Sequence, residues 1–186
     1  MQYATDYLQN LKAALDGVKP DDIGTAVAWL KEARDNDRFI YVCGNGGSAS
    51  IASQMVVDLV KGASYRRPKR FKMIGLTDSI ATITAYANDV DYESVFVEQL
   101  RNFAREGDVL LAISGSGNSP NVLRAVEYAN SVGCRTIGLT QSGGGALKDL
   151  ARLTLGVPER HMGRLEDSFF ILTHIMMYAF MDRAVE

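Results

Sequence analysis

Three serines in one short turn are the residues of this sequence best suited to hold a phosphate. Ser114, Ser116 and Ser119 follow the apolar run 109–113, alternate with glycines and stand just before Pro120. Three hydroxyls and several free backbone N–H groups can surround the oxygens of one phosphate without any lysine or arginine. The alternative is a hydroxyl-rich loop that caps only its own helix, because serine is a common N-cap residue.

A glycine-rich turn at 44–48, GNGGS, follows another apolar run at 39–43. Glycines have no Cβ, so their backbone N–H groups can approach a ligand closely, and Ser48 can cap the helix that follows. The partial positive charge of a helix N-terminus favours an anion, most often a phosphate. The turn lacks the lysine of a Walker loop and the third glycine of the dinucleotide motif, which disfavours a nucleotide. Taken alone, it is equally typical of ordinary chain reversal in an α/β protein.

The spacing of hydrophobic residues predicts the strands and helices that hold these turns. Apolar runs predict buried strands at 39–43, 72–76, 109–113, 135–139 and 153–157. Helical spacing predicts two leading helices before the first strand, a helix opened by Ser48, helices at 79–87 and 92–103 separated by a break at 88–91, a helix opened by Pro120, a short helix after 145, and a closing helix over 165–183. This alternation predicts a doubly wound five-stranded parallel sheet flanked by helices, as one domain over 1–186.

Composition excludes several classes of function. The chain has 186 residues, 47% of them hydrophobic, and a net charge of −2. This balance gives no global attraction for nucleic acid or an anionic membrane surface.

The two cysteines lie in apolar runs and are expected to be small buried hydrophobes in a reducing compartment. The N-terminus resembles no signal peptide and no segment resembles a membrane span, so the expected location is the cytoplasm. The basic cluster at 66–72 is expected to be an exposed loop.

The two turns together resemble a known family. CGNGGSA at 43–49 and ISGSGNSPNV at 113–122 are similar to the paired motifs of the sugar isomerase, or SIS, domain, whose members bind phosphosugars. AYANDVDYESVF at 85–96 and the RLED…H pattern of the last helix resemble the bacterial phosphoheptose isomerases, which interconvert sedoheptulose 7-phosphate and a heptose aldose phosphate. The resemblance implies that substrate is bound by Asn45, Gly46, Gly47, Ser48, Asn88, Asp89, Ser114, Gly115, Ser116, Ser119 and Glu166.

The resemblance also implies a catalytic pair, a glutamate after the first glycine turn and a histidine on the last helix. Those positions hold Asp58 and His174 here, so the histidine is kept and the carboxylate arm is one methylene shorter. No redox cofactor is required. Some members bind zinc, and the matching set here is Gln54, Asp58, Glu166 and His174, with acceptable ligands at three of its four positions. Glu166 and His174 are eight residues apart, or about 12 Å of helical rise, so both side chains would have to stretch toward one ion.

Plainer interpretations of these residues stay open. Asp58 could be an ordinary helical aspartate, and His174 lies in an apolar stripe where a lone histidine is more often a core residue. His161 has no role in the motif. Two functions therefore compete. The first is an isomerase that moves a proton between adjacent carbons of a phosphosugar, with Asp58 and His174 as base and acid. The second is a non-enzymatic SIS protein that binds phosphosugars or associates with a replication initiator, with the basic loop as its contact surface.

Spacing along the chain also bears on assembly. Ser48 and Asp58 are ten residues apart, or about 15 Å of helical rise, so one subunit can hardly present both to one curled sugar phosphate unless another segment folds back. The closing helix is apolar on all sides, and such surplus apolar surface is usually buried against a partner. The resemblance implies a homotetramer with shared sites. We therefore expect a homo-oligomer, a tetramer, whose active site is built between subunits.

Overall fold

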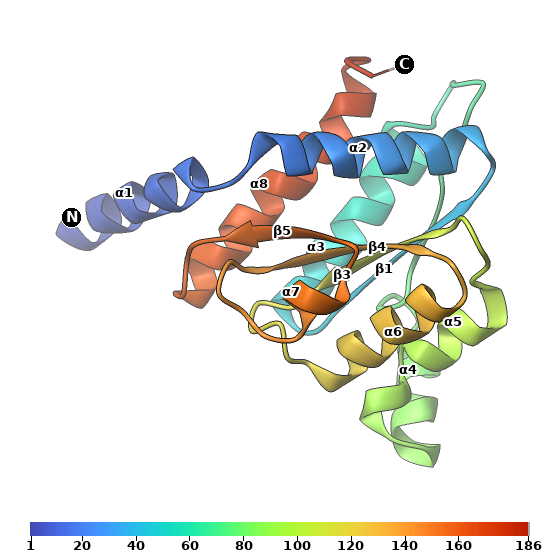
Figure 1. Cartoon of the computed structure of the whole chain (residues 1–186). Helices are drawn as coiled ribbons and strands as arrows, with labels where there is room; N and C mark the ends of the chain where they lie inside the picture. Colours follow the sequence, from blue (N-terminus) through green and yellow to red (C-terminus); the bar gives the residue numbers. More distant parts are fainter. Residues whose placement is uncertain (186) are drawn as a thin grey trace.

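The computed structural model describes residues 1–185, arranged as a central sheet between two layers of helices (Figure 1). Its strands are β1 (Phe39–Gly44), β2 (Lys72–Gly75), β3 (Val109–Ile113), β4 (Arg135–Gln141) and β5 (Leu153–Val157). Its helices are α1 (Gln2–Asp16), α2 (Pro20–Asp35), α3 (Gly47–Val57), α4 (Ile80–Asp89), α5 (Val97–Phe103), α6 (Pro120–Ser131), α7 (Leu147–Leu150) and α8 (Met162–Met181). A π-helix, η1 (Asp58–Gly62), continues α3, and a 3₁₀ turn, η2 (Tyr92–Ser94), precedes α5.

All five strands are parallel and lie in the order β2-β1-β3-β4-β5. The chain therefore leaves β1 in one direction along the sheet to build β2, and in the other to build β3, β4 and β5. The predicted fold class is confirmed. Ligands in such sheets bind beyond the carboxyl ends of the strands, where the strand order reverses. Here that point lies between β1 and β3, the two strands that the serine and glycine turns follow.

Each face of the sheet has its own core. Along β1, Ile40 and Val42 face a cluster built with α2, α3 and α8, whereas Tyr41 and Cys43 face a cluster built with α5, α6 and α7. This alternation is the two-residue period of a strand buried on both sides. Both cysteines are buried and unpaired, as their apolar surroundings predict.

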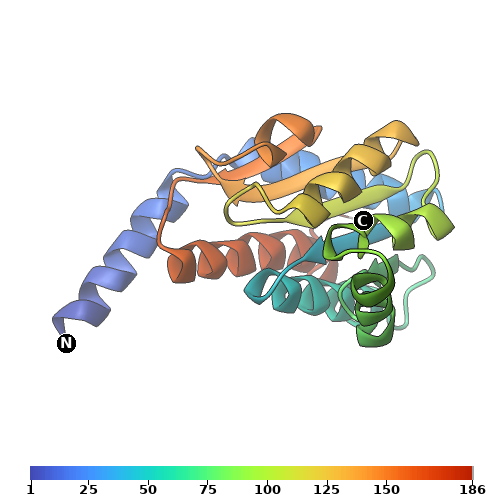
Figure 2. The same cartoon turned by 90° about the horizontal axis from the view of Figure 1, so that it is seen from below.

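Two helices pack poorly against this body. Only Ala14 of α1 is buried, and α4 has no buried residue. Figure 2 shows α1 projecting beyond the end of the sheet. Large apolar side chains stay exposed on both helices, among them Tyr3, Leu8 and Ile80. Helix α8, predicted to be apolar on all sides, buries one face against the sheet. Elsewhere on the helix, Ile175 and Tyr178 remain about half exposed.

The basic cluster 66–72 is largely exposed, as predicted, but three of its cations also bind within the chain. Arg67 donates to the backbone oxygen of Met181 at the end of α8, and Lys69 pairs with Asp35. Lys72 pairs with Asp37. Within residues 1–185, no helix has the length and apolar character needed to span a bilayer.

Two local predictions are wrong. Helix α3 begins at Gly47, with Gly46 as its N-cap and no side-chain cap, so the N-cap lies two residues before the expected Ser48. Gly46 can take this role because its φ of +54° costs glycine little. The predicted break at 88–91 begins late, because Val90 N–H still bonds to the Tyr86 carbonyl and α4 runs through Asn88 and Asp89.

Candidate active site

The serine turn forms a compact loop at the carboxyl end of β3. The hydroxyls of Ser114 and Ser119 lie 3.1 Å apart, and Ser114 is buried whereas Ser116 is exposed at the rim. Ser119 is the N-cap of α6, but its side chain makes no capping hydrogen bond. Its hydroxyl therefore points across the loop instead of closing the helix, which argues against the interpretation of the loop as a mere cap.

The backbone of this loop offers donors as well. Within residues 1–185, the N–H groups of Gly115, Ser116 and Ser119 have no hydrogen-bond acceptor. Gly117 has a φ of +70°, and a Cβ there would collide with the Gly144 carbonyl oxygen. Three hydroxyls and three unpaired N–H groups at a helix start form a site of positive potential without a cationic side chain.

The glycine turn lies beside it, at the carboxyl end of β1. A Cβ on Gly44 would lie 2.7 Å from that of Ser48, so the turn is sterically closed to larger residues. Ser48 is buried beneath this contact. A Cβ on Gly47 would collide with the carboxylate of Glu166, which comes from the second turn of α8. Glu166 therefore lies beside the glycine turn.

A reciprocal amide pair links the two turns. Asn45 Nδ2 donates to Asn121 Oδ1, and Asn121 Nδ2 donates back to Asn45 Oδ1, each at 2.9 Å. The hydroxyl of Tyr92, from η2, also donates to Asn45 Oδ1 at 3.0 Å. Sequence reasoning assigned no role to Asn121 or Tyr92. The available signal for Asn121 was a polar residue within the ISGSGNSPNV motif, on a helix whose other inward positions are apolar.

The loop after β4 supports the serine turn from behind. Leu147 N–H donates to the Gly117 carbonyl at 2.9 Å, and Ala146 N–H donates to Asn118 Oδ1 at 3.0 Å.

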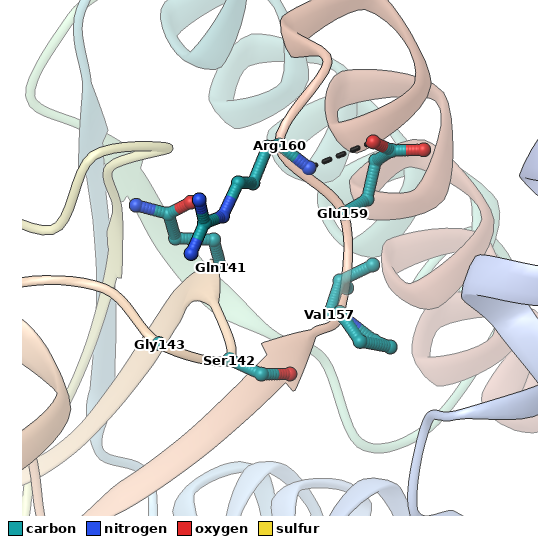
Figure 3. A pocket seen from close by; sticks show the side chains of 7 residues that line it. Gln141, Ser142, Gly143, Val157, Glu159 and Arg160 are labelled. Carbon is teal, nitrogen blue, oxygen red and sulfur yellow. Dashed lines mark hydrogen bonds between the residues drawn. The ribbon is translucent and has the colours of Figure 1, made fainter.

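A neighbouring cavity of about 490 Å³ opens between the carboxyl ends of β4 and β5 (Figure 3). It is lined by Gln141, Ser142, Gly143, Val157, Pro158, Glu159 and Arg160.

The predicted acid and base meet at the other end of α3. His174 Nε2 lies 3.7 Å from Asp58 Oδ2, and Gln54 Nε2 donates to Asp58 Oδ1 at 3.0 Å. The Asp58 side chain is 13% exposed and that of His174 45% exposed, so His174 is not the core residue that its apolar stripe predicts. Its ring lies between those of Phe170 and Tyr178.

Asp58 occupies an unusual backbone position. It begins the π-helix η1, and its carbonyl accepts from Ala63 N–H five residues on, at 2.8 Å. Its Oδ2 atom is buried and, within residues 1–185, has no hydrogen-bond partner. A buried carboxylate oxygen without a donor is costly, so this atom is suited to receive a proton or a ligand.

The structure therefore brings the predicted residues together as two groups and not as one. Because α3 runs back along the sheet from the glycine turn, Asp58 lies about 15 Å of helical rise from Ser48. His174 lies twelve residues into α8, which packs beside α3 and also starts at the carboxyl edge of the sheet. The phosphate-binding turns and the acid–base pair of one chain lie at opposite ends of the same helix pair.

The predicted zinc set is divided in the same way. Gln54, Asp58 and His174 lie together, with a buried unpaired oxygen facing an imidazole nitrogen, but Glu166 lies against Gly47 at the other end. Within the described residues, no three His, Cys, Asp or Glu side chains are grouped to hold a metal ion. The four residues do not fit one zinc ion within a single subunit.

Asn88 and Asp89 stay apart from both groups. Both are exposed at the end of α4, where Asn88 Nδ2 donates to Asp89 Oδ1 at 2.8 Å. Within residues 1–185, neither side chain has a hydrogen bond or ion pair with the two turns. Their predicted contact with sugar hydroxyls remains a prediction.

Comparison with known proteins identifies the family. The SIS domain model matches residues 3–141. A phosphoheptose isomerase of Nitratiruptor sp. is 40% identical over 154 residues, which are 83% of this chain and 82% of the relative. The chain belongs to the phosphoheptose isomerase branch of the SIS-domain family. Solved phosphoheptose isomerases from Francisella tularensis and Neisseria gonorrhoeae superpose with TM-scores of 0.89 and 0.87, at 30% and 29% identity. The alignments cover 97% and 99% of this chain and 95% and 96% of those chains.

Membership of the phosphoheptose isomerase branch makes the chain a phosphosugar isomerase and favours an enzyme over a non-enzymatic binding protein. The engagement of the basic loop with Asp35, Asp37 and Met181 points the same way, because those cations are partly used within the chain.

Proposed function

We propose that this protein interconverts sedoheptulose 7-phosphate and a D-glycero-heptose 7-phosphate. The observation that carries the proposal is the pair of turns at the switch point of the sheet, in a chain of the phosphoheptose isomerase branch. Ser114, Ser116, Ser119 and the free N–H groups of their loop would hold the phosphate. Asn45, Gly46 and Gly47, with Glu166 behind them, would line the sugar.

The proposed reaction is proton transfer through an enediol. A base removes a proton from C1 of the ketose while an acid donates a proton to the C2 oxygen. The resulting enediol is protonated at C2 as the C1 hydroxyl loses its proton, which gives the aldose with no net gain or loss of atoms. Asp58, with its unpaired buried oxygen, is the proposed base, and His174 is the proposed acid.

The two groups must reach one substrate, so we propose that they come from different subunits. The helical rise of about 15 Å between Ser48 and Asp58 within one chain supports this arrangement, as do the exposed apolar side chains of α1, α4 and α8. The proposed assembly is a tetramer of about 80 kDa, four copies of a 20.3 kDa chain related by closed symmetry.

Zinc binding stays a prediction. Asp58 and His174 are the two residues of zinc-ligand type that lie together in one subunit, and the proposed proton transfer needs only the carboxylate and the imidazole. The metal content of purified protein, before and after a chelator, tests this prediction independently of activity.

Turnover of sedoheptulose 7-phosphate by the purified protein tests the proposed function. Conversion to the aldose phosphate, followed by proton NMR of the anomeric signals, is the expected result. Exchange of the transferred hydrogen with deuterated solvent would support the enediol route. Binding of the phosphosugar without turnover, both with and without added zinc, would favour the non-enzymatic alternative.

A further inference from the structure

We infer that Asn121 and Tyr92 are positioning residues that fix the Asn45 side chain and thereby hold the glycine turn in register with the serine turn. The inference rests on the proposed function, because it concerns how Asn45 would meet the sugar. Neither Asn121 nor Tyr92 is among the predicted substrate-binding residues.

The hydrogen bonds of Asn121 leave it one orientation. Val122 N–H donates to Asn121 Oδ1 at 2.9 Å, so that oxygen faces the start of α6 and Asn45. The amide nitrogen of Asn121 then faces Asn45 Oδ1, and the reciprocal pair closes. Asn121 is 2% exposed. A buried side-chain amide needs its partners, so Asn121 favours the one placement of Asn45 that supplies them.

Tyr92 holds the same atom from a third element. Its hydroxyl donates to Asn45 Oδ1, which thus accepts from both Tyr92 and Asn121. The segment that carries Tyr92 is itself tied to α6, because Arg124 pairs with Asp91 and Glu93. Asn45 is therefore held by Asn121 of α6 and by Tyr92 of η2.

This arrangement leaves Asn45 one hydrogen-bonding group for a ligand. Its oxygen already accepts two bonds, and one of its two amide hydrogens is donated to Asn121. The second amide hydrogen remains. Asn45 therefore presents a donor, suited to a hydroxyl or carbonyl oxygen of the sugar. Asn121 and Tyr92 set the direction in which that donor points.

A double-mutant cycle tests the inference. Asn121→Ala is expected to lower kcat/KM for sedoheptulose 7-phosphate about tenfold in the natural background, and less than twofold when Asn45 is already alanine. Once Asn45 is gone, nothing remains for Asn121 to position. Inhibition by inorganic phosphate should stay unchanged in every variant, since the serine turn is intact. Equal losses in both backgrounds, or weaker phosphate inhibition, would show a general structural role and overturn the inference.

Tyr92→Phe provides a second variant that removes only a hydroxyl from a half-exposed ring, should Asn121→Ala fail to fold. It should lower kcat/KM severalfold, and again only when Asn45 is present. Asn102→Ala is the matched control, because Asn102 is an exposed asparagine bonded to its own helix. If the unmodified protein has no turnover, the proposed function fails, and the same cycle is read by calorimetry of sedoheptulose 7-phosphate binding. Additive effects there, or no binding at all, would then overturn the inference.

Discussion

Oδ2 of Asp58 lies 3.7 Å from Nε2 of His174 and is buried without a hydrogen-bond partner among residues 1–185. The gap is too long for a hydrogen bond, although the two atoms face each other across two packed helices. Substrate or a small movement of either side chain must complete the pair. Catalytic hydrogen bonds often tighten only when substrate is bound, so the gap is consistent with an acid–base role.

We expect Asp58→Asn to lower kcat by about a hundredfold or more while leaving phosphosugar affinity within a few fold, because a general base acts mainly in the transition state. Steady-state kinetics and calorimetry of sedoheptulose 7-phosphate measure the two effects. Asp21→Asn, which changes an exposed aspartate at the start of α2, is the matched control. A parallel loss of affinity and turnover would argue that Asp58 binds substrate instead.

Mixing Asp58→Asn with Ser116→Ala protein should restore part of the activity after subunit exchange. The reason is that a site built from the turns of one subunit and the acid–base pair of another is intact at some interfaces of a mixed oligomer. Light scattering checks the oligomeric state. A monomer, or verified exchange without recovery, would contradict the shared site.

Ser119→Ala should weaken phosphosugar binding by about 1 to 3 kcal/mol, because the lost hydroxyl faces Ser114 across the loop and would donate to a charged oxygen. Calorimetry measures the change. Ser131→Ala, at the far end of α6, removes a hydroxyl bonded to the Tyr128 carbonyl and should leave affinity unchanged. If Ser119→Ala binds normally, the phosphate belongs to the glycine turn.

Gly117→Ala should cost more than about 1 kcal/mol of the free energy of unfolding, since φ of +70° is unfavourable for alanine. The added methyl would also collide with the Gly144 carbonyl. Gly143→Ala is the control in the same region, because a Cβ there meets no atom within 4 Å. Urea denaturation compares them, and equal stability of the two variants would contradict the loop geometry.

The ion pair between Glu159 and Arg164, at the start of α8, should make the stability of the protein depend on pH. The side-chain hydrogen bond from Arg164, with two backbone N–H groups, lowers the pKa of Glu159 from 4.5 to about 2. The folded state therefore favours the carboxylate form. Its contribution to stability is complete above pH 4.5 and is lost as the pH falls toward 2.

Unfolding by urea at pH 6 and pH 3 tests this expectation. Glu159→Gln should be less stable than the natural protein at pH 6, and the difference should shrink at pH 3. Glu127→Gln, on the exposed face of α6, is the control and should show no such pH dependence. A constant difference at both pH values would mean that Glu159 acts through packing and not through its charge.

Local sequence patterns were sufficient to predict the strands, the two turns and the class of ligand. Five apolar runs of strand length are local features, and each became a strand of the sheet. Local signals were less reliable at helix ends. Gly46 took the N-cap position expected of Ser48, and α4 continued through Asn88 and Asp89, because backbone hydrogen bonds decide where a helix ends.

Contacts between residues far apart in the sequence depend on how the elements pack in three dimensions. Asn45 and Asn121 are 76 residues apart and pair because β1 and β3 are neighbours at the switch point. Asp58 and His174 meet because α3 and α8 pack side by side on one face of the sheet. The same packing sends Glu166 to Gly47 and away from His174. Spacing along one helix fixes how far apart its residues are, but the residues they face depend on which helices the sheet brings together.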